Sequence, residues 1–136
     1  MLYNGANGET AIQLKQLLGY DKHNISDEEI NESFNVLLTD CTSDNSNFVL
    51  NIANLLVVQN QSRILTNFTD VLKNSFKADI QSVDFANDGQ NAVNEINGWI
   101  ATKTNNKIKP IRDKPFDTLT KLVILNAVYF KGLLFK

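Results

Sequence analysis

Few residues in this sequence have the type and spacing that catalysis needs. The one histidine, His23, lies in a polar stretch that predicts a surface turn, whereas the one cysteine, Cys41, falls on the apolar stripe of the following helix. A cysteine in such a place is far more often a buried thiol than a nucleophile, so we expect no Cys–His dyad. The carboxylates Asp27, Glu28 and Glu29 fit the first turn of that helix better than an acid–base pair.

Other chemical signatures are also missing from the sequence. No cluster of His, Cys, Asp and Glu has the spacing of a metal site, and no P-loop, dinucleotide fingerprint or nucleophile elbow is present. We therefore predict no enzyme activity, no metal and no cofactor. A formal net charge of −2 gives no reason to expect nucleic acid as a partner. The apolar runs are too short to predict a membrane span.

Four Asn-x-Ser/Thr sequons begin at Asn24, Asn31, Asn60 and Asn67, and each is a candidate N-glycosylation site. They favour a secreted glycoprotein. The alternative is that the sequons are accidental, since the chain has 19 Asn among 136 residues and so many Asn generate sequons by chance.

The composition, 43% hydrophobic and 21% charged, is that of a globular domain, and its periodicity predicts four helices. The first begins at a Thr10 capping box and ends at Gly19, with a core stripe of Ala11, Leu14 and Leu18. The second begins at Ser26, and its core stripe comprises Ile30, Phe34, Leu37, Leu38 and Cys41. The third spans about residues 65–76 and the fourth about 90–104.

Three strands are predicted between these helices, over residues 48–58, 78–85 and 122–129. The first and the last are apolar on both faces, which is typical of strands in a sheet that is covered on both sides. Asn51 and Asn54 interrupt the first strand. As buried amides they would need hydrogen-bond partners, by default a cross-strand or loop carbonyl. Because helices and strands alternate, we expect a mixed fold with helical crossovers.

Five segments of the sequence match one family in the correct order. They read GANGETAIQ at 5–13, LNIANLLVVQ at 50–59, FKADIQSVDF at 76–85, INGWI and TNNKI between 96 and 108, and LNAVYFKG at 125–132. They cover essentially the whole chain and resemble successive segments of the serpin family. The sequence departs from the family pattern at Leu134, where a tryptophan is usual.

The resemblance implies an α+β fold, the mixed, multi-element serpin fold. About four helices plus three strands of the large central sheet are expected, with one helix packed across the sheet face. Residues 1–136 would then be an incomplete single serpin domain that lacks the N-terminal helices and the C-terminal reactive-centre loop.

The resemblance also implies a serine-type endopeptidase inhibitor. A serpin offers an exposed reactive loop to a protease; after cleavage the loop inserts as a new strand into the large sheet, and the trapped enzyme is distorted. The expected partner is a serine protease, with the cysteine class as the alternative. We expect the reactive-centre bond to lie outside this chain, which would then be inactive alone. The alternative function is that of a non-inhibitory serpin, such as a carrier, storage or chaperone protein.

Individual residues acquire roles from the same resemblance. Asn126 aligns with the asparagine of the shutter, where the sheet opens, and we expect a buried, hydrogen-bonded amide there rather than a solvated one at an edge. Residues 122–131 would line one side of the insertion gap. The family's structural motifs include Asn97, Trp99, Thr104, Phe130, Lys131 and Gly132. We expect Trp99 to be a core anchor and not a ligand contact.

Three further expectations concern the environment of the chain. The second helix carries Asp27, Glu28, Glu29 and Glu32 and has no Lys or Arg between residues 26 and 44, so heparin binding is disfavoured. Serpins are mostly secreted, which together with the sequons favours an extracellular location over a cytoplasmic one. Strands that need neighbours predict poor folding of the isolated chain and aggregation through its open strand edge.

Overall fold

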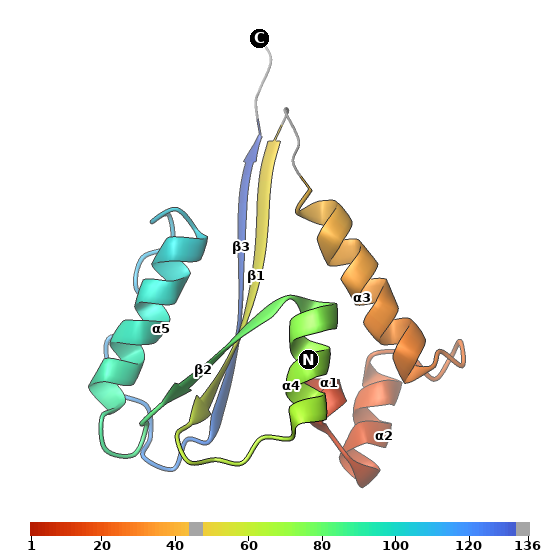
Figure 1. The fold of residues 1–136 in the computed structure, drawn as a ribbon, viewed down its shortest axis with the longest axis horizontal. Coiled ribbons are helices and arrows are strands. Elements are labelled where there is room, and N and C mark those ends of the chain that lie inside the picture. Colours follow the sequence, from red (N-terminus) through yellow and green to blue (C-terminus); the bar gives the residue numbers. More distant parts are fainter. Residues whose placement is uncertain (44–47, 133–136) are drawn as a thin grey trace.

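The computed structural model describes residues 1–43 and 48–132 (Figure 1). Its helices are α1 (Leu2–Gly5), α2 (Gly8–Leu17), α3 (Asp27–Cys41), α4 (Thr66–Phe76) and α5 (Gly89–Lys103). Its strands are β1 (Phe48–Gln59), β2 (Ala78–Val83) and β3 (Leu122–Gly132). This architecture confirms the predicted fold class: α2 to α5 are the four expected helices, and α1 adds one turn. Leu134 lies outside the described residues.

The three strands form one sheet in the order β2-β1-β3 (Figure 1). β1 pairs in parallel with β2 along Asn54–Gln59 and antiparallel with β3 along Phe48–Val58. β1, which is apolar on both faces, lies at the centre of the sheet, as expected for a strand that is covered on both sides. β3 has the same apolar pattern, but it lies at the edge of the described sheet and is largely exposed. α4 makes the helical crossover that a parallel pair such as β1 and β2 requires.

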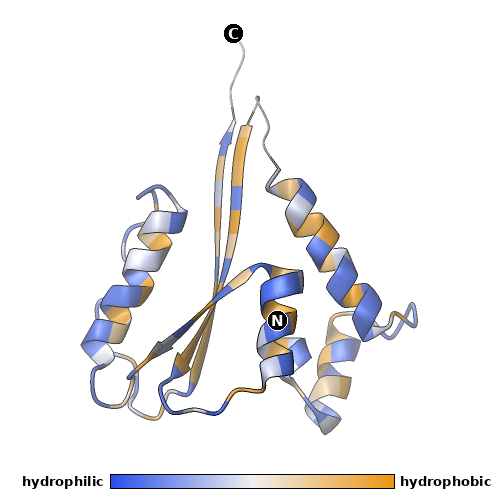
Figure 2. Ribbon diagram, in the orientation of Figure 1, coloured by the Kyte–Doolittle hydropathy of each residue, from blue (hydrophilic) through white to orange (hydrophobic). Residues whose placement is uncertain are grey.

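Helices cover both faces of this sheet. On one face α5 packs across the strands, as the resemblance implies, and the buried cluster comprises Leu55, Val57, Val83, Phe85, Ala92, Ile96, Trp99, Ile100 and Ala127. On the other face α4 contributes to a second cluster of Leu56, Val58, Leu72, Phe76 and Ala78. Alternation along β1 sends successive residues to opposite clusters. Figure 2 shows largely hydrophobic strands between helices with one hydrophobic and one hydrophilic side.

Local capping determines where α2 and α3 begin. Ser26 forms the predicted capping box: its hydroxyl accepts from the Glu29 N–H, and its own N–H donates to the Glu29 carboxylate. The predicted start of α2 is wrong, because Asn7, one turn before Thr10, caps that helix by accepting from the Gly8 N–H at 2.8 Å. Asparagine is as strong an N-cap as serine, so the helix begins at the earlier residue.

Two predicted core stripes are only partly buried. No residue of α2 is buried, and Leu18 just beyond it is 50% exposed. The inward face of α3 passes through Ile30 and Leu38, which are buried. Leu37 is 54% exposed, because it lies about 100° around the helix from Leu38. Cys41, predicted to be buried, is partly exposed at the end of the helix.

Within residues 1–43 and 48–132, no helix combines the length and the apolar character that crossing a membrane would take.

Candidate functional site

The candidate site is built on β3. One edge of β3 pairs with β1 from Leu122 to Gly132, whereas no strand of the described chain lies along the other edge. The N–H and C=O groups of an unpaired edge can accept another strand. Val128 is 51% exposed on the same strand. An extended segment laid along β3 would therefore gain main-chain hydrogen bonds and apolar contacts together.

Two asparagines join β3 to the centre of the sheet. Asn126 lies opposite Asn54 in the β1–β3 register, and its Nδ2 donates to the Asn54 Oδ1 at 2.9 Å. Asn54 is 8% exposed, and its own Nδ2 donates at 2.7 Å to the carbonyl of Phe76, the last residue of α4. Helix-end carbonyls have no partner within their own helix. This asparagine relay (Asn126, Asn54 and the Phe76 carbonyl) therefore satisfies both the buried amide and the helix end.

The expected burial of Asn126 is wrong for this chain. Asn126 is exposed, because β3 is the last strand of the described sheet and no described strand lies beyond it. Its amide is nevertheless hydrogen-bonded, to Asn54 and, at 3.4 Å, to the Ala53 carbonyl. Cross-strand pairing, rather than burial, holds the side chain in place.

Trp99 anchors α5 to the sheet, as predicted. It is 8% exposed, and its Nε1–H donates to Asp79 of β2 at 2.7 Å. Lys103, one turn further along α5, pairs with the same carboxylate at 2.9 Å and lies 5.8 Å from the Trp99 ring centroid. Partial burial raises the pKa of Asp79, but the hydrogen bonds from Trp99 and Lys103 lower it by more. The pKa therefore lies below its ordinary value.

Asn97 and Thr104 shape the connection that leads from α5 to β3. Asn97 donates from Nδ2 to the Arg112 carbonyl at 2.6 Å and accepts from the Ile111 N–H at 3.1 Å. Thr104 is fully buried, and its hydroxyl donates to the Ile100 carbonyl at 2.7 Å. Both motif residues are thus structural, and they hold the connection close to α5.

The motif residues at the end of β3 lie at the surface. Phe130 is 65% exposed, and its ring centroid lies 6.0 Å from that of Phe48. Lys131 and Gly132 are exposed beside it. A Cβ atom added at Gly132 would lie 3.4 Å from the Phe130 ring, which is ordinary van der Waals contact.

A polar junction at the opposite end of β1 is not among the predicted sites. Gln59, the last residue of β1, is 9% exposed; its side chain donates to Asp84 at 3.1 Å and accepts from the Phe85 N–H at 2.7 Å. Asp84 also accepts from the Asn87 N–H at 3.0 Å. Hydrogen bonds from Asn87 and Gln59 hold the pKa of Asp84 well below its usual range. The sequence signal for this junction is a glutamine that ends an otherwise apolar strand.

We expect acid to weaken this junction. Because the folded-state pKa of Asp84 is depressed, its contribution to stability is complete above the unfolded value of about 3.9 and is lost as the pH falls through the folded value. The urea midpoint of Trp99 fluorescence should fall between about pH 5 and pH 2, and should fall less for Asp84→Asn. Asp88→Asn is the control, since the Asp88 side chain makes no capping hydrogen bond. Equal acid dependence in Asp84→Asn and the unaltered chain would contradict the role of Asp84.

The four sequon asparagines differ in accessibility. Asn24 is exposed in the turn before α3, and Asn67 is exposed in the first turn of α4. Asn31 is partly buried and accepts a hydrogen bond from α1 at 2.7 Å. Asn60 is partly buried and accepts from the neighbouring glutamine at 2.6 Å. The fold therefore leaves more room for a glycan at Asn24 and Asn67.

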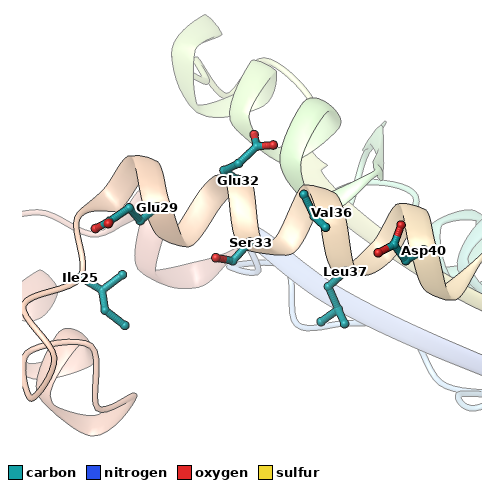
Figure 3. Close-up of a pocket in the computed structure, with 7 residues that line it drawn as sticks. All are labelled: Ile25, Glu29, Glu32, Ser33, Val36, Leu37 and Asp40. Atoms are coloured by element: carbon teal, nitrogen blue, oxygen red, sulfur yellow. The ribbon is translucent and has the colours of Figure 1, made fainter.

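The outer face of α3 carries an open groove with acidic and apolar side chains (Figure 3). Glu29, Glu32 and Asp40 line it together with Val36 and Leu37. Its described lining contains three carboxylates and no lysine or arginine. Such a face repels polyanions.

Residues with catalytic potential lie far apart. His23 is exposed in the turn before α3 and Cys41 is the last residue of that helix, so a 15-residue helix, about 22 Å long, separates them. Within residues 1–43 and 48–132, no group of three His, Cys, Asp or Glu side chains is placed to hold a metal ion. What the described residues offer is a strand edge and the hydrogen bonds that position it.

The chain matches the family model Serpin (serine protease inhibitor) over residues 1–136. It is 40% identical to Iripin-3 from Ixodes ricinus, covering 97% of this chain and 34% of that protein. It is 39% identical to Intracellular coagulation inhibitor 2 from Tachypleus tridentatus, covering 97% of this chain and 32% of that protein. The chain therefore spans about a third of the length of the relatives it matches.

Solved structures have the same arrangement of helices and strands. Emu ovalbumin matches with a TM-score of 0.85 at 25% identity, over 96% of this chain and 36% of that chain. Human thyroxine-binding globulin in complex with thyroxine matches with a TM-score of 0.83 at 25% identity, covering 96% of this chain and 34% of that chain. Cleaved Serpin 42Da matches with a TM-score of 0.79 at 34% identity, covering 96% of this chain and 34% of that chain. The family model, the sequence relatives and the structures agree that this chain belongs to the serpin family.

Proposed function

We propose that this chain is part of a serine protease inhibitor that inserts its cleaved reactive loop as a strand beside β3. The open outer edge of β3 carries the proposal, because an inserted loop needs an edge with unpaired main-chain groups. The opposite edge of β3 is fixed by its pairing with β1, and helices pack on both faces of the sheet. The similarity to Intracellular coagulation inhibitor 2 supports an inhibitory rather than a non-inhibitory serpin.

In this mechanism Asn126 lies at the opening of the sheet. A strand inserted beside β3 would cover Asn126, which is exposed in this chain. Covering an amide is costly when its hydrogen-bonding groups lose water without gaining partners. Asn126 already donates to Asn54, so we propose that the asparagine relay prepares the gap for insertion.

The reactive loop itself, on this proposal, comes from sequence outside residues 1–136 of an incomplete single domain. We therefore expect the chain alone not to inhibit trypsin-like or chymotrypsin-like proteases. The measurement is denaturing gel electrophoresis after incubation with each enzyme, and a stoichiometric complex that resists the detergent would contradict the expectation. A transcript read beyond Lys136 tests the parent function: it should encode a hinge of small residues followed by an exposed loop.

A non-inhibitory serpin is the second candidate function. Thyroxine-binding globulin has a similar fold and was solved with thyroxine bound, so a carrier is compatible with the fold of this chain. Bulky or charged residues in the hinge beyond Lys136 would prevent loop insertion and would favour the carrier, storage or chaperone alternative.

If the protein is an inhibitor, as first proposed, its target is a serine protease, with a cysteine protease as the alternative class.

Heparin is not a partner on this proposal. The acidic groove on α3 would repel a sulfated polyanion. We expect the chain to pass unretained through a heparin column at physiological salt, in contrast to native protease nexin-1, which was solved with heparin. Retention that is lost on raising the salt concentration would contradict this.

We propose an extracellular location with glycosylation at Asn24 and Asn67. These two sequon asparagines are exposed, whereas Asn31 and Asn60 are engaged in hydrogen bonds. When the chain is expressed through a eukaryotic secretory pathway, treatment with a glycosidase should lower its mass. The loss of mass should be smaller for Asn24→Gln, which lacks one of the two proposed glycans. A chain without glycans would favour the cytoplasmic alternative, to which the name of one relative also points.

A further inference from the structure

The sheet has a second open edge, on the side opposite to β3. β1 is 12 residues long, but β2 pairs only with its last part, from Asn54 to Gln59. Along residues 48–53 the β2 side of β1 has no main-chain partner among the described residues. We call residues 48–53 the upper edge of β1. This edge is separate from the proposed insertion gap. A strand inserted beside β3 would lie on the β3 side of β1, whereas the upper edge faces the β2 side.

The turn at Lys77 keeps this edge open. Lys77 ends α4 in the left-handed conformation, with φ 50° and ψ 34°, and the chain enters β2 at Ala78. The Lys77 Nζ donates to the Asn74 carbonyl at 2.9 Å and to the Asn35 side chain of α3 at 2.5 Å. These bonds fix the turn between two helices, so β2 cannot extend along the upper edge.

A pocket of about 340 Å³ lies on the upper edge of β1. The strand contributes residues 51–54, and the ends of three helices and the start of β2 contribute Thr42, Lys77, Asp79, Thr102 and Lys103. Two ammonium groups and one carboxylate therefore line the pocket. Since Asp79 is already paired with Lys103 and hydrogen-bonded to Trp99, the pocket keeps an excess of one positive charge.

We propose that the upper edge of β1 binds an extended acidic peptide segment of a partner protein, which adds to the sheet as a short strand. The main-chain groups of residues 48–53 supply the pairing, which is how peptides add to exposed sheet edges. Lys77 and Lys103 select for aspartate or glutamate, because complementary charge favours the matching partner and repels others. A second copy of this chain that pairs through its own upper edge is a poorer occupant, since it would bring the same two cations against the first pair.

The test uses two synthetic peptides and hydrogen–deuterium exchange of the chain. The first is an acetylated and amidated hexapeptide of alternating valine and glutamate, and the second has lysine in place of glutamate. In excess, the glutamate peptide should slow exchange in residues 48–53 and leave residues 122–132 unchanged. The lysine peptide should have a weaker effect.

Charge variants test the selectivity. Lys77→Gln combined with Lys103→Gln should weaken binding of the glutamate peptide about three- to tenfold, the scale of two exposed ion pairs. Lys73→Gln, on the exposed side of α4, is the matched control and should not change binding. Unchanged far-ultraviolet circular dichroism in the double variant shows that the chain remains folded. Trp99 fluorescence does not serve here, because Lys103 lies 5.8 Å from the Trp99 ring centroid.

Three outcomes would overturn the proposal. These are equal effects of the two peptides, no slowing in residues 48–53, and an affinity that the double variant does not change. If exchange slows in β3 alone, strand insertion beside β3 is supported and this second site is not. Conversely, failure of insertion beside β3 leaves the upper edge of β1 standing, so the two proposals are separable.

Discussion

Replacing Leu55 with alanine should lower the free energy of unfolding by about 2–5 kcal/mol. Leu55 is fully buried on the central strand, in the cluster beneath α5, so truncation leaves a cavity where helix and sheet meet. A loss of this size is a large fraction of the whole stability of a typical domain. Urea unfolding followed by the fluorescence of Trp99, the one tryptophan, measures it. The protein concentration should stay below the onset of the association that open edges predict.

Two further substitutions make the Leu55 result interpretable. Leu55→Met conserves side-chain volume and should cost less than about 1.5 kcal/mol, which stays measurable if the alanine variant does not fold. Val49, on the same strand, is 47% exposed, and Val49→Ala should change stability by no more than about 0.5 kcal/mol. Equal losses at Leu55 and Val49 would contradict a sheet covered by α5 at its centre.

Replacing Asn54 with alanine should destabilise the chain by about 1–3 kcal/mol. The change removes the partner of the Phe76 carbonyl and of the Asn126 amide at once. Asn54 is buried, so the Phe76 carbonyl has little access to replacement water. Urea unfolding with Trp99 fluorescence again gives the loss.

A double-mutant cycle separates the two bonds of the asparagine relay. Asn126 is exposed, and Asn126→Ala should therefore cost only the net value of one hydrogen bond, about 0.5–1.5 kcal/mol. The double variant should lose less than the sum of the two single losses, because both single changes remove the same bond. Strict additivity, or a larger loss at Asn126 than at Asn54, would contradict the relay.

Much of the fold follows from local sequence patterns. The apolar pattern on both faces of residues 48–58 predicts a strand inside a covered sheet, and β1 is the central strand, whereas the same pattern in residues 122–129 belongs to the edge strand β3. The Ser26 capping box predicts the start of α3, and it is formed. Both are short-range signals, in which neighbouring residues fix the conformation.

The errors arise where distant residues decide the outcome. Leu18 and Leu37 have helical spacing that fits a core, yet they are exposed, because burial also requires an element to pack on that face. Asn126 has the type and setting of a buried amide, but it is exposed since β3 is the edge of the described sheet. Periodicity predicts which face of a helix or strand a side chain lies on, but not whether another element packs against that face.

The candidate site depends even more on long-range geometry. Asn54 and Asn126 are 72 residues apart in the chain and meet only because of the β1–β3 register. The hydrophobic pattern restricts which residues of each strand share a face, but no short hairpin turn joins β1 to β3 and fixes which residues lie opposite each other. The family motifs predict the proposed insertion gap beside β3, whereas the structure provides the hydrogen bonds that position β3.

The most direct test of strand insertion is hydrogen–deuterium exchange with a peptide that imitates an inserted strand. The probe is an acetylated peptide of alternating threonine and valine, as long as β3, and the control has proline at alternate positions, which removes its hydrogen-bond donors. Slower exchange along Leu122–Gly132 with the first peptide only, and no change in residues 48–53, is the predicted result. Unchanged exchange in β3, or an equal effect of the proline peptide, would contradict a β3 edge that accepts a strand.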